Sequence, residues 1–439
     1  MEETKKPLKI LMTAMFDFGH LSSCLGIGYF LVKRGHQVYF AHFPKYQSII
    51  ERQGMQFISL YDYADEGAEL SDAVPRSSVN FKPRFERSLK MGPFESLKEQ
   101  LATGAINTGF IKILDNYITE NDIMHKIVGQ LEPQICLVDY LYPLPWMYLV
   151  DCPVVPIKST NPVGLYSRGP PPNSGFSVKE STKDWTEFKD INNEVNILIL
   201  EKIVEIFKQY EVPLIHRDHV KDLGIYIYPE PIDYRELGPP RNRWVRLDSA
   251  LREHDTEEFE IPEKLKDKPG KLIYVSMGTM ASTVTELLTM ILTPLANSPH
   301  RFIVSTGPNG DSITLYDNMW GDKFVNQMAI LPKVDLFITH GGSNSLIEAL
   351  AAGVPCIVIP QFGDQPDNAQ RLADLGLGVR LNLHEFSDEK LLKAIEDVLN
   401  DEELHSKVTR ASERLKSTDS RDKVISLIEE LAETGSVLF

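Results

Sequence analysis

The sequence predicts an α/β protein built from two doubly wound domains that face each other across a cleft. Three observations support this fold class. The chain of 439 residues is longer than one hydrophobic core usually supports. Short apolar runs alternate with helical patterns in two separate series. Between the two series, residues 229–271 are dense in proline and charge, which is typical of an interdomain connection.

The first series opens with a βαβ unit at residues 8–43. The run KILMTAMF predicts a strand, FDFGH a short loop, LGIGYFLVKR a helix that stops at Gly35, and QVYFAHF a second strand. Further on, QICLVDY at 134–140 is an apolar run closed by an acid and an aromatic residue, which favours a buried strand ending at a functional edge. CPVVPIKST predicts the next strand. This order indicates a parallel sheet.

Two stretches of the first half lack a clean pattern. Residues 62–120 contain three proline breakers before a helical stretch at 110–118, and we expect variable, substrate-facing structure there. The segment SRGPPPNSGFS at 167–177 cannot be regular structure. Its composition fits a surface loop beside a ligand cleft and an idle linker equally well.

The second series follows the connection. LIYVSMG predicts a strand with a turn at Gly278, residues 284–296 a helix, and SLIEALAAG another helix. The runs RFIVSTG, DLFITH and PCIVIP predict further strands. This alternation indicates a second parallel sheet covered on both faces. Because ligands bind at the carboxyl ends of such strands, both sheets should point these ends into the intervening cleft.

Composition excludes several classes of function. The chain is 42% apolar and 25% charged, as globular proteins are. A formal net charge of -16 would repel phosphate backbones and anionic membrane surfaces, so we expect no nucleic-acid partner. The N-terminus shows no cleavage pattern of a secretion signal, and no apolar run reaches the length of a membrane span. We therefore expect a cytoplasmic protein without a membrane anchor.

The four cysteines lie in or beside apolar segments, without the CxxC or Cys/His spacing of a metal site. They are Cys24, Cys136, Cys152 and Cys356. We expect buried, reduced thiols and no bound metal.

The strongest chemical pattern lies at residues 324–365, where a strand ends at His340 and a helix opens after Gly341 and Gly342. The residues that open this helix are Ser343, Asn344 and Ser345. Small residues let a phosphate approach the backbone closely. The free amide groups and the positive end of the helix dipole favour an anion such as a diphosphate. His340 would add another hydrogen-bond donor.

A structural alternative exists for the same residues. Ser345 and Glu348 have the spacing of a capping box, and on this segment alone that alternative is favoured. The next strand shifts the balance, because it delivers Gly363, Asp364 and Gln365 to the same sheet edge. A carboxylate and an amide together can form hydrogen bonds with sugar hydroxyls, although either side chain can also cap the helix that follows.

The segment Phe324–Gln370 resembles the signature FxTHxGxNSxxEAxxxGVPxxxxPxxxDQxxNA of the UDP-glycosyltransferases, which have the GT-B fold. This resemblance implies a donor site for a UDP-sugar. In such a site the diphosphate would meet His340, Asn344 and Ser345, beside Gly342 and Ser343, the ribose would meet Glu348, and the transferred sugar would meet Asp364 and Gln365.

Two further segments resemble donor-binding parts of the family. A Trp-x-Pro-Gln segment stacks on uracil in the family, and here it is Phe324 to Gln327, with Phe324 offering the ring. The run YVSMGTM, with Ser276, Gly278 and Thr279, resembles the other phosphate-proximal loop.

The catalytic residues implied by the resemblance lie in the first half of the chain. FDFGHLSSCLGIGYFLVKRGHQVYF resembles the opening βαβ unit of the family, in which a histidine after the first strand is the general base, and His20 occupies that place. An aspartate at the end of a later strand orients the base, and Asp139 matches it. Where the family often has proline three residues after the histidine, this chain has Ser23. His36, in the RGH turn, is most simply a polar residue after the helix.

Aromatic residues near the predicted base could wall an apolar acceptor pocket, although core packing explains each of them equally well. They are Phe16, Phe18, Phe81, Tyr142 and Trp146.

The resemblance also implies a division of the chain. We expect an acceptor-binding domain at 1–245, a linker at 246–268, a UDP-sugar-binding domain at 269–415, and a C-terminal helix at 416–439 that packs back on the first domain.

The function implied is inverting transfer of a hexose, most simply glucose from UDP-glucose, to a hydroxyl of a small lipophilic acceptor. We expect a monomer that needs neither metal nor cofactor, similar to the soluble bacterial-type or xenobiotic-handling members. Two alternatives remain open: a sugar-nucleotide epimerase of the same fold, and a catalytically silent module that only binds the nucleotide sugar.

Overall fold

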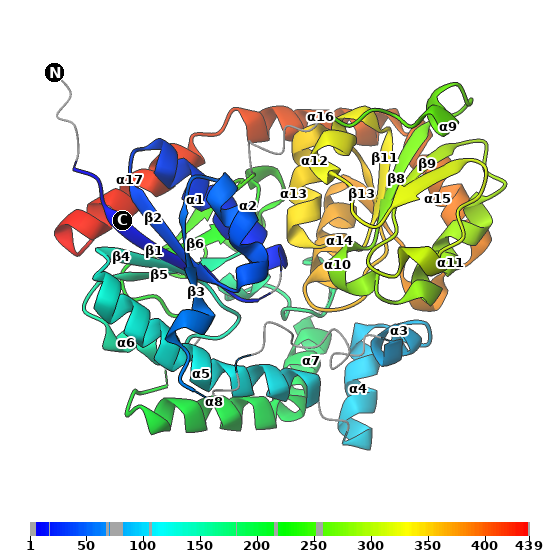
Figure 1. The fold of residues 1–439 in the computed structure, drawn as a ribbon. Coiled ribbons are helices and arrows are strands. Elements are labelled where there is room, and N and C mark those ends of the chain that lie inside the picture. Colours follow the sequence, from blue (N-terminus) through cyan, green and yellow to red (C-terminus); the bar gives the residue numbers. More distant parts are fainter. Residues whose placement is uncertain are drawn as a thin grey trace.

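The computed structural model describes residues 6–16, 18–66, 70, 82–104, 108–180, 182–214, 218–251 and 258–437. Figure 1 shows two α/β units side by side, each with a sheet flanked by helices. One sheet has seven strands in the order β3-β2-β1-β4-β5-β6-β7, and the other has six in the order β10-β9-β8-β11-β12-β13. The pairings in both sheets are parallel. The predicted fold class is confirmed.

The first sheet consists of β1 (Lys9–Ala14), β2 (Gln37–His42), β3 (Gln56–Ser59), β4 (Ile135–Asp139), β5 (Val154–Lys158), β6 (Gly224–Ile227) and β7 (Trp244–Leu247). Strands β1 and β4 are neighbours, and Ala14 pairs with Asp139 at their carboxyl ends. All five residues of β4 are buried. A strand covered by helices on both faces is apolar throughout, which is why QICLVDY lacks alternation.

The helices of the first half are α1 (Phe18–Lys33), α2 (Gln47–Arg52), α3 (Lys82–Ser88), α4 (Pro93–Thr103), α5 (Thr108–Leu131), α6 (Trp146–Leu149), α7 (Thr182–Val195) and α8 (Ile197–Gln209). Two sequence expectations need correction. Helix α1 already begins at Phe18, so His20 lies in its first turn rather than in a loop. Helix α5 extends well beyond the predicted stretch at 110–118.

The second sheet consists of β8 (Leu272–Ser276), β9 (Arg301–Ser305), β10 (Met319–Asp322), β11 (Leu336–Thr339), β12 (Cys356–Val358) and β13 (Gly378–Arg380). Its helices are α9 (Glu263–Lys266), α10 (Gly278–Ala281), α11 (Thr285–Leu295), α12 (Gln327–Ile330), α13 (Ser343–Ala352), α14 (Gln365–Leu375), α15 (Asp388–Asn400) and α16 (Glu402–Lys416). Helix α13 follows β11, and α14 follows β12, so both open at the carboxyl edge of the sheet.

The last helix, α17 (Ser420–Thr434), returns to the first domain (Figure 1). Four of its apolar residues belong to the core beside the first sheet, namely Val424, Ile425, Ile428 and Leu431. His36 helps to hold the helix, because its Nε2 lies 3.1 Å from Glu429 Oε1 and its Nδ1 accepts from the Leu8 N–H at 3.2 Å. His36 is therefore a buried packing residue.

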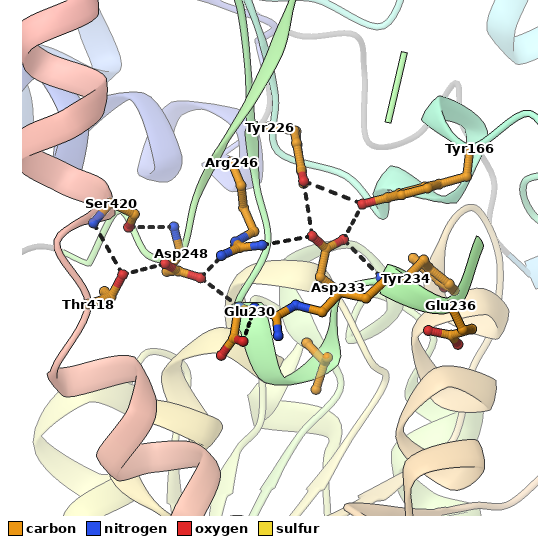
Figure 2. Close-up of polar contacts among 12 residues, drawn as sticks. Tyr166, Tyr226, Glu230, Asp233, Tyr234, Glu236, Arg246, Asp248, Thr418 and Ser420 are labelled. Atoms are coloured by element: carbon orange, nitrogen blue, oxygen red, sulfur yellow. Dashed lines mark hydrogen bonds and ion pairs between the residues drawn. The ribbon is translucent and has the colours of Figure 1, made fainter. Parts of the chain in front are cut away.

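A polar network joins the domains where the chain crosses back, as Figure 2 shows. Asp233 accepts hydrogen bonds from two tyrosine hydroxyls and from Arg246. Arg246 also donates to Asp248 at 3.0 Å. On the other side, Asp248 accepts from the Thr418 hydroxyl at 2.5 Å and donates its backbone N–H to Ser420 Oγ at 3.0 Å. The end of β7 is thus fixed to the segment that begins α17.

Helix α3 belongs to the first half of the chain but contacts the second domain, whereas α4 packs beside α7 (Figure 1). Lys82 forms an ion pair with Glu286 of α11. The Ser88 hydroxyl donates to the Gln361 carbonyl at 3.4 Å. These contacts place α3 next to the loop that precedes α14.

All four cysteines are free thiols, and three of them are buried. In the part of the chain that the structure describes, no helix has the length and apolar character needed to cross a membrane.

Candidate active site

A cleft of about 2360 Å³ runs between the domains, and residues of both domains line it. It lies where the carboxyl ends of the central strands of both sheets meet, as expected for doubly wound folds. Most of the predicted site residues line it. From the first domain these are Phe16, Phe18, His20, Asp139 and Tyr142, and from the second Ser276, Gly278, Thr279, Phe324, Gln327, His340, Gly342, Ser343, Asn344, Ser345, Glu348, Asp364 and Gln365.

One predicted acceptor residue, Trp146, does not line this cleft, and another lies outside the described residues. Trp146 is fully buried, and it packs in the core with side chains of α5 and α8. Its backbone N–H donates to Asn121 Oδ1 at 2.7 Å, which fixes α6 against α5. The core alternative therefore explains Trp146. Phe81 lies outside the described residues.

His20 and Asp139 form a buried pair at the carboxyl ends of the central strands of the first sheet. Asp139 is the last residue of β4, and His20 lies in the first turn of the helix that follows the neighbouring strand β1. His20 Nδ1 and Asp139 Oδ1 are 3.0 Å apart. The other carboxylate oxygen, Oδ2, is buried without a hydrogen-bond partner in the structure as described. A carboxylate held this way is a strong acceptor for the imidazole N–H.

Ser159 also contacts the histidine, and sequence reasoning missed it. Its Oγ lies 3.1 Å from His20 Nδ1. Ser159 directly follows β5, the strand beside β4, so it reaches the same edge. The strand-end position of Ser159 in CPVVPIKST was the available signal, because neighbouring parallel strands bring their carboxyl ends to one edge of the sheet. Asp139 and Ser159 thus both contact Nδ1 of the imidazole.

On the opposite side, His340 packs against two glycines. Gly278 has φ +71°, and a Cβ added there would lie 2.5 Å from the His340 ring. A Cβ on Gly342 would lie 2.7 Å from His340 Nε2. Desolvation by burial lowers the pKa of His340 to about 4, against a smaller opposing effect of its hydrogen bond with the Ser276 backbone. The imidazole is thus neutral at pH 7. Its single N–H can donate either to the Ser276 backbone or to a phosphate oxygen.

Glu348, Ser345 and Gln327 form one connected group. The Gln327 amide donates to Glu348 Oε2 at 2.5 Å and to Ser345 Oγ at 3.2 Å. Ser345 and Glu348, three residues apart on α13, therefore both contact Gln327 of α12. A carboxylate fixed in this way suits a ligand that offers hydroxyl groups, such as a ribose.

Asp364 is tied to both domains. Its Oδ2 accepts from the Ser343 hydroxyl at 2.9 Å and from the Asn161 backbone N–H, across the cleft, at 2.8 Å. Oδ1 is therefore the oxygen left for a ligand hydroxyl. Gln365 uses its amide oxygen to cap its own loop, accepting from the Gln361 N–H at 2.9 Å. Asn161, which follows β5, was not predicted from the sequence.

Asn344 contacts the first domain rather than the loops of its own domain. Its Nδ2 donates to the Gly19 carbonyl at 2.7 Å, and its Oδ1 accepts from the Ser23 hydroxyl at 2.8 Å. The side chain predicted to meet the diphosphate is thus bonded to α1 in this conformation. Its backbone N–H lies in the first turn of α13, where an amide group has no acceptor within the helix.

Phe324 is 71% exposed, and it lines the cleft. A large apolar ring that the fold leaves this exposed is available to stack on a ligand.

The loop at 167–177 lines the cleft and is bonded to the opposite domain. The backbone N–H groups of Asn173 and Gly175 donate to the Asp367 carboxylate of α14 at 2.6 and 2.8 Å. Arg380 donates to the Gly175 carbonyl at 2.6 Å. Of the two sequence alternatives, these contacts support the loop beside the cleft.

Within the described ranges, no group of three or more His, Cys, Asp or Glu side chains is arranged to hold a metal ion.

Comparison with known proteins finds similar sequences and folds among glycosyltransferases. Residues 260–420 match the family model described as UDP-glucoronosyl and UDP-glucosyl transferase. The chain is 25% identical to the NDP-glycosyltransferase YjiC of Bacillus subtilis over 98% of this chain and 99% of that protein. It is 35% identical to human UDP-glucuronosyltransferase 2B28, but over only 32% of this chain and 27% of that protein.

Solved structures share the fold. The glycotransferase of kitacinnamycin has a TM-score of 0.69 at 17% identity and covers 97% of this chain and 99% of its own. The spinosyn rhamnosyltransferase SpnG, complexed with thymidine diphosphate, has a TM-score of 0.60 at 17% identity, with 96% of this chain and 100% of its own covered. Together, these comparisons show that residues 260–420 are similar to the family described as UDP-glucoronosyl and UDP-glucosyl transferase, and that the chain has the GT-B fold of glycosyltransferases.

Proposed function

We propose that this enzyme moves a hexose, preferably glucose, from a UDP-sugar to a hydroxyl group of a small lipophilic acceptor, with inversion at the anomeric carbon. The observation that carries the proposal is the buried pair of His20 and Asp139, with 3.0 Å between Nδ1 and Oδ1, on the cleft opposite the donor residues. A binding module that transfers nothing would have no need for such a pair.

The proposed chemistry follows from the two nitrogens of His20. Asp139 holds the proton on Nδ1, so Nε2 keeps its lone pair and removes the acceptor proton as the acceptor oxygen attacks the anomeric carbon. The bond between that carbon and the diphosphate oxygen breaks on the opposite face. Asp139 stabilises the imidazolium that forms. The departing diphosphate gains stabilisation from the N-terminus of α13 and from His340.

Donor and acceptor classes are proposed from the lining residues. Asp364 offers Oδ1 beside Gln365, and such a pair suits the hydroxyls of a neutral hexose such as glucose. Phe16, Phe18 and Tyr142 line the half of the cleft near His20, which favours a lipophilic acceptor. The names of the relatives include both glucosyl and glucuronosyl transferases, so the choice of sugar needs a direct assay.

The test is a mass-spectrometric screen of UDP-sugars against phenolic and alcoholic acceptors. We expect transfer from UDP-glucose, and a loss of turnover of about a hundred- to ten-thousand-fold in His20→Ala, the range for a lost general base. Calorimetric UDP binding should stay nearly unchanged in that variant. Full activity in His20→Ala would overturn the mechanism. Conversion of UDP-GlcNAc without any acceptor would instead identify an epimerase.

A further inference from the structure

The turn of α1 that carries His20 is bonded directly to the first turn of α13. Asn344 makes both contacts, with Nδ2 donating to the carbonyl of Gly19, the residue before His20, and Oδ1 accepting from the Ser23 hydroxyl. The two distances are 2.7 and 2.8 Å. One amide therefore links the helix of the predicted base to the helix of the predicted diphosphate site.

Ser23 is suited to this contact by its position and its chemistry. It lies four residues after Gly19, so both face the same side of α1. Ser23 is 2% exposed, so its hydroxyl has few alternative partners in water, although the Asn344 side of the bond is only half-buried. Proline, which the family often has three residues after the histidine, carries no hydroxyl and could not make this bond.

We propose that Ser23 and Asn344 form an interdomain tie that positions His20 against the diphosphate end of the donor, which makes Ser23 a positioning residue for transfer. This inference rests on the proposed function, because it requires His20 to be the base. The two reacting groups lie on different domains, so their separation depends on contacts between the domains. Small errors in such geometry are costly, since a misplacement of about 1 Å can lower a rate about a hundredfold.

Ser23→Ala tests the tie, with UDP-glucose and the best acceptor from the screen. We expect kcat to fall about three- to tenfold, which is the effect of one neutral hydrogen bond, while the calorimetric Kd for UDP changes less than about twofold. Ser23→Thr keeps a hydroxyl and should retain most of the activity. Ser23→Cys keeps the side-chain volume and should behave like the alanine variant, which separates the lost bond from a packing defect.

Ser412→Ala is the matched control. The Ser412 hydroxyl is also buried and donates to the Ala351 carbonyl of the same helix α13 at 2.8 Å, but within the second domain. This variant removes a comparable bond without touching the interdomain contact. It should lower the melting temperature and leave kcat unchanged.

A double-mutant cycle with Asn344→Ala gives the decisive result. If the two residues act as one tie, adding Ser23→Ala to Asn344→Ala lowers kcat no further. The tie is overturned if Ser23→Ala keeps the wild-type kcat, or if the two effects multiply. The activities of the wild type and of His20→Ala test the proposed function separately. If His20→Ala loses activity but Ser23→Ala keeps the wild-type kcat, only the tie is refuted. If the wild type transfers no sugar, the proposed function is refuted.

Discussion

Asp139→Asn removes one negative charge from the predicted reaction centre and leaves the volume of the side chain almost unchanged. Asp139 is 1% exposed, and its Oδ1 lies 3.0 Å from His20 Nδ1. Two unit charges at that separation attract by about 5 kcal/mol at an effective dielectric constant near 20. This energy is available only after His20 has taken the acceptor proton, so it stabilises the transition state more than the ground state.

The substitution also changes which nitrogen carries the proton. An asparagine can turn its NH2 group toward Nδ1 and donate to it, which moves the imidazole proton to Nε2. Nε2 then has no lone pair for the acceptor proton. Loss of the whole attraction between the two charges would lower the rate by about four orders of magnitude. We therefore expect kcat to fall about a hundred- to ten-thousand-fold.

The assay is the initial rate of glycoside formation, measured by liquid chromatography with mass detection at saturating donor. UDP affinity and the melting curve should remain close to wild type. Asp335→Asn is a matched control, because Asp335 lies at the opposite edge of the second sheet, where it accepts from the Leu272 N–H at 2.9 Å. A turnover within tenfold of wild type in folded Asp139→Asn would refute the role given to this carboxylate.

Three further predictions concern other residues. Phe324→Ala should weaken UDP binding in calorimetry by about 1–3 kcal/mol, the usual value of a base stacked on an aromatic ring, and equal affinity would exclude the stack. His36→Ala should lower the free energy of unfolding in urea by about 2–3 kcal/mol without changing kcat, because it leaves buried Glu429 without its histidine partner. Burial lowers the pKa of His42 from 6.5 to about 3, so the unfolded chain binds a proton there that the folded chain does not, and stability falls as pH drops below about 6.5. Between pH 7 and 5 this group costs about 2 kcal/mol, and His42→Gln should lose less stability over that interval than wild type; an equal loss would assign the pH dependence to other groups.

Much of the fold was predictable, because apolar runs of the length of strands alternate with helical patterns in this chain. The ends of the central strands were predictable too, and they indicated His340 and Asp364, whereas His20 and Asp139 were selected by the family resemblance. All four residues line the same cleft. Their meeting depends on a general rule, namely that strands of a parallel sheet bring their carboxyl ends to one edge. The prediction that Trp146 lines the acceptor pocket was wrong. Sequence alone does not distinguish an aromatic residue that faces the core from one that faces the cleft.

Contacts between distant segments were not predictable. No local pattern indicates that Lys82 meets Glu286, or that a proline-rich loop donates its backbone N–H groups to Asp367. Such contacts depend on how the two domains pack, which no periodicity in one segment encodes. Ser23 shows the same limit, since the sequence marks it only as a departure from the family, and its partner Asn344 is visible only in the structure.

The residues after β5 show how one strand end can control both halves of the site. Ser159 contacts the His20 imidazole at 3.1 Å, and two residues later the Asn161 backbone N–H reaches Asp364 at 2.8 Å. The Asn161 side chain also donates to Asn368 Oδ1 at 2.8 Å, so the second domain holds this segment twice. Because β5 is hydrogen-bonded between β4 and β6, the segment has a fixed origin. The separation of His20, the proposed base, from Asp364, the proposed sugar ligand, therefore also depends on a short stretch of chain that starts from a central strand, and not on the long connection at 229–271 alone.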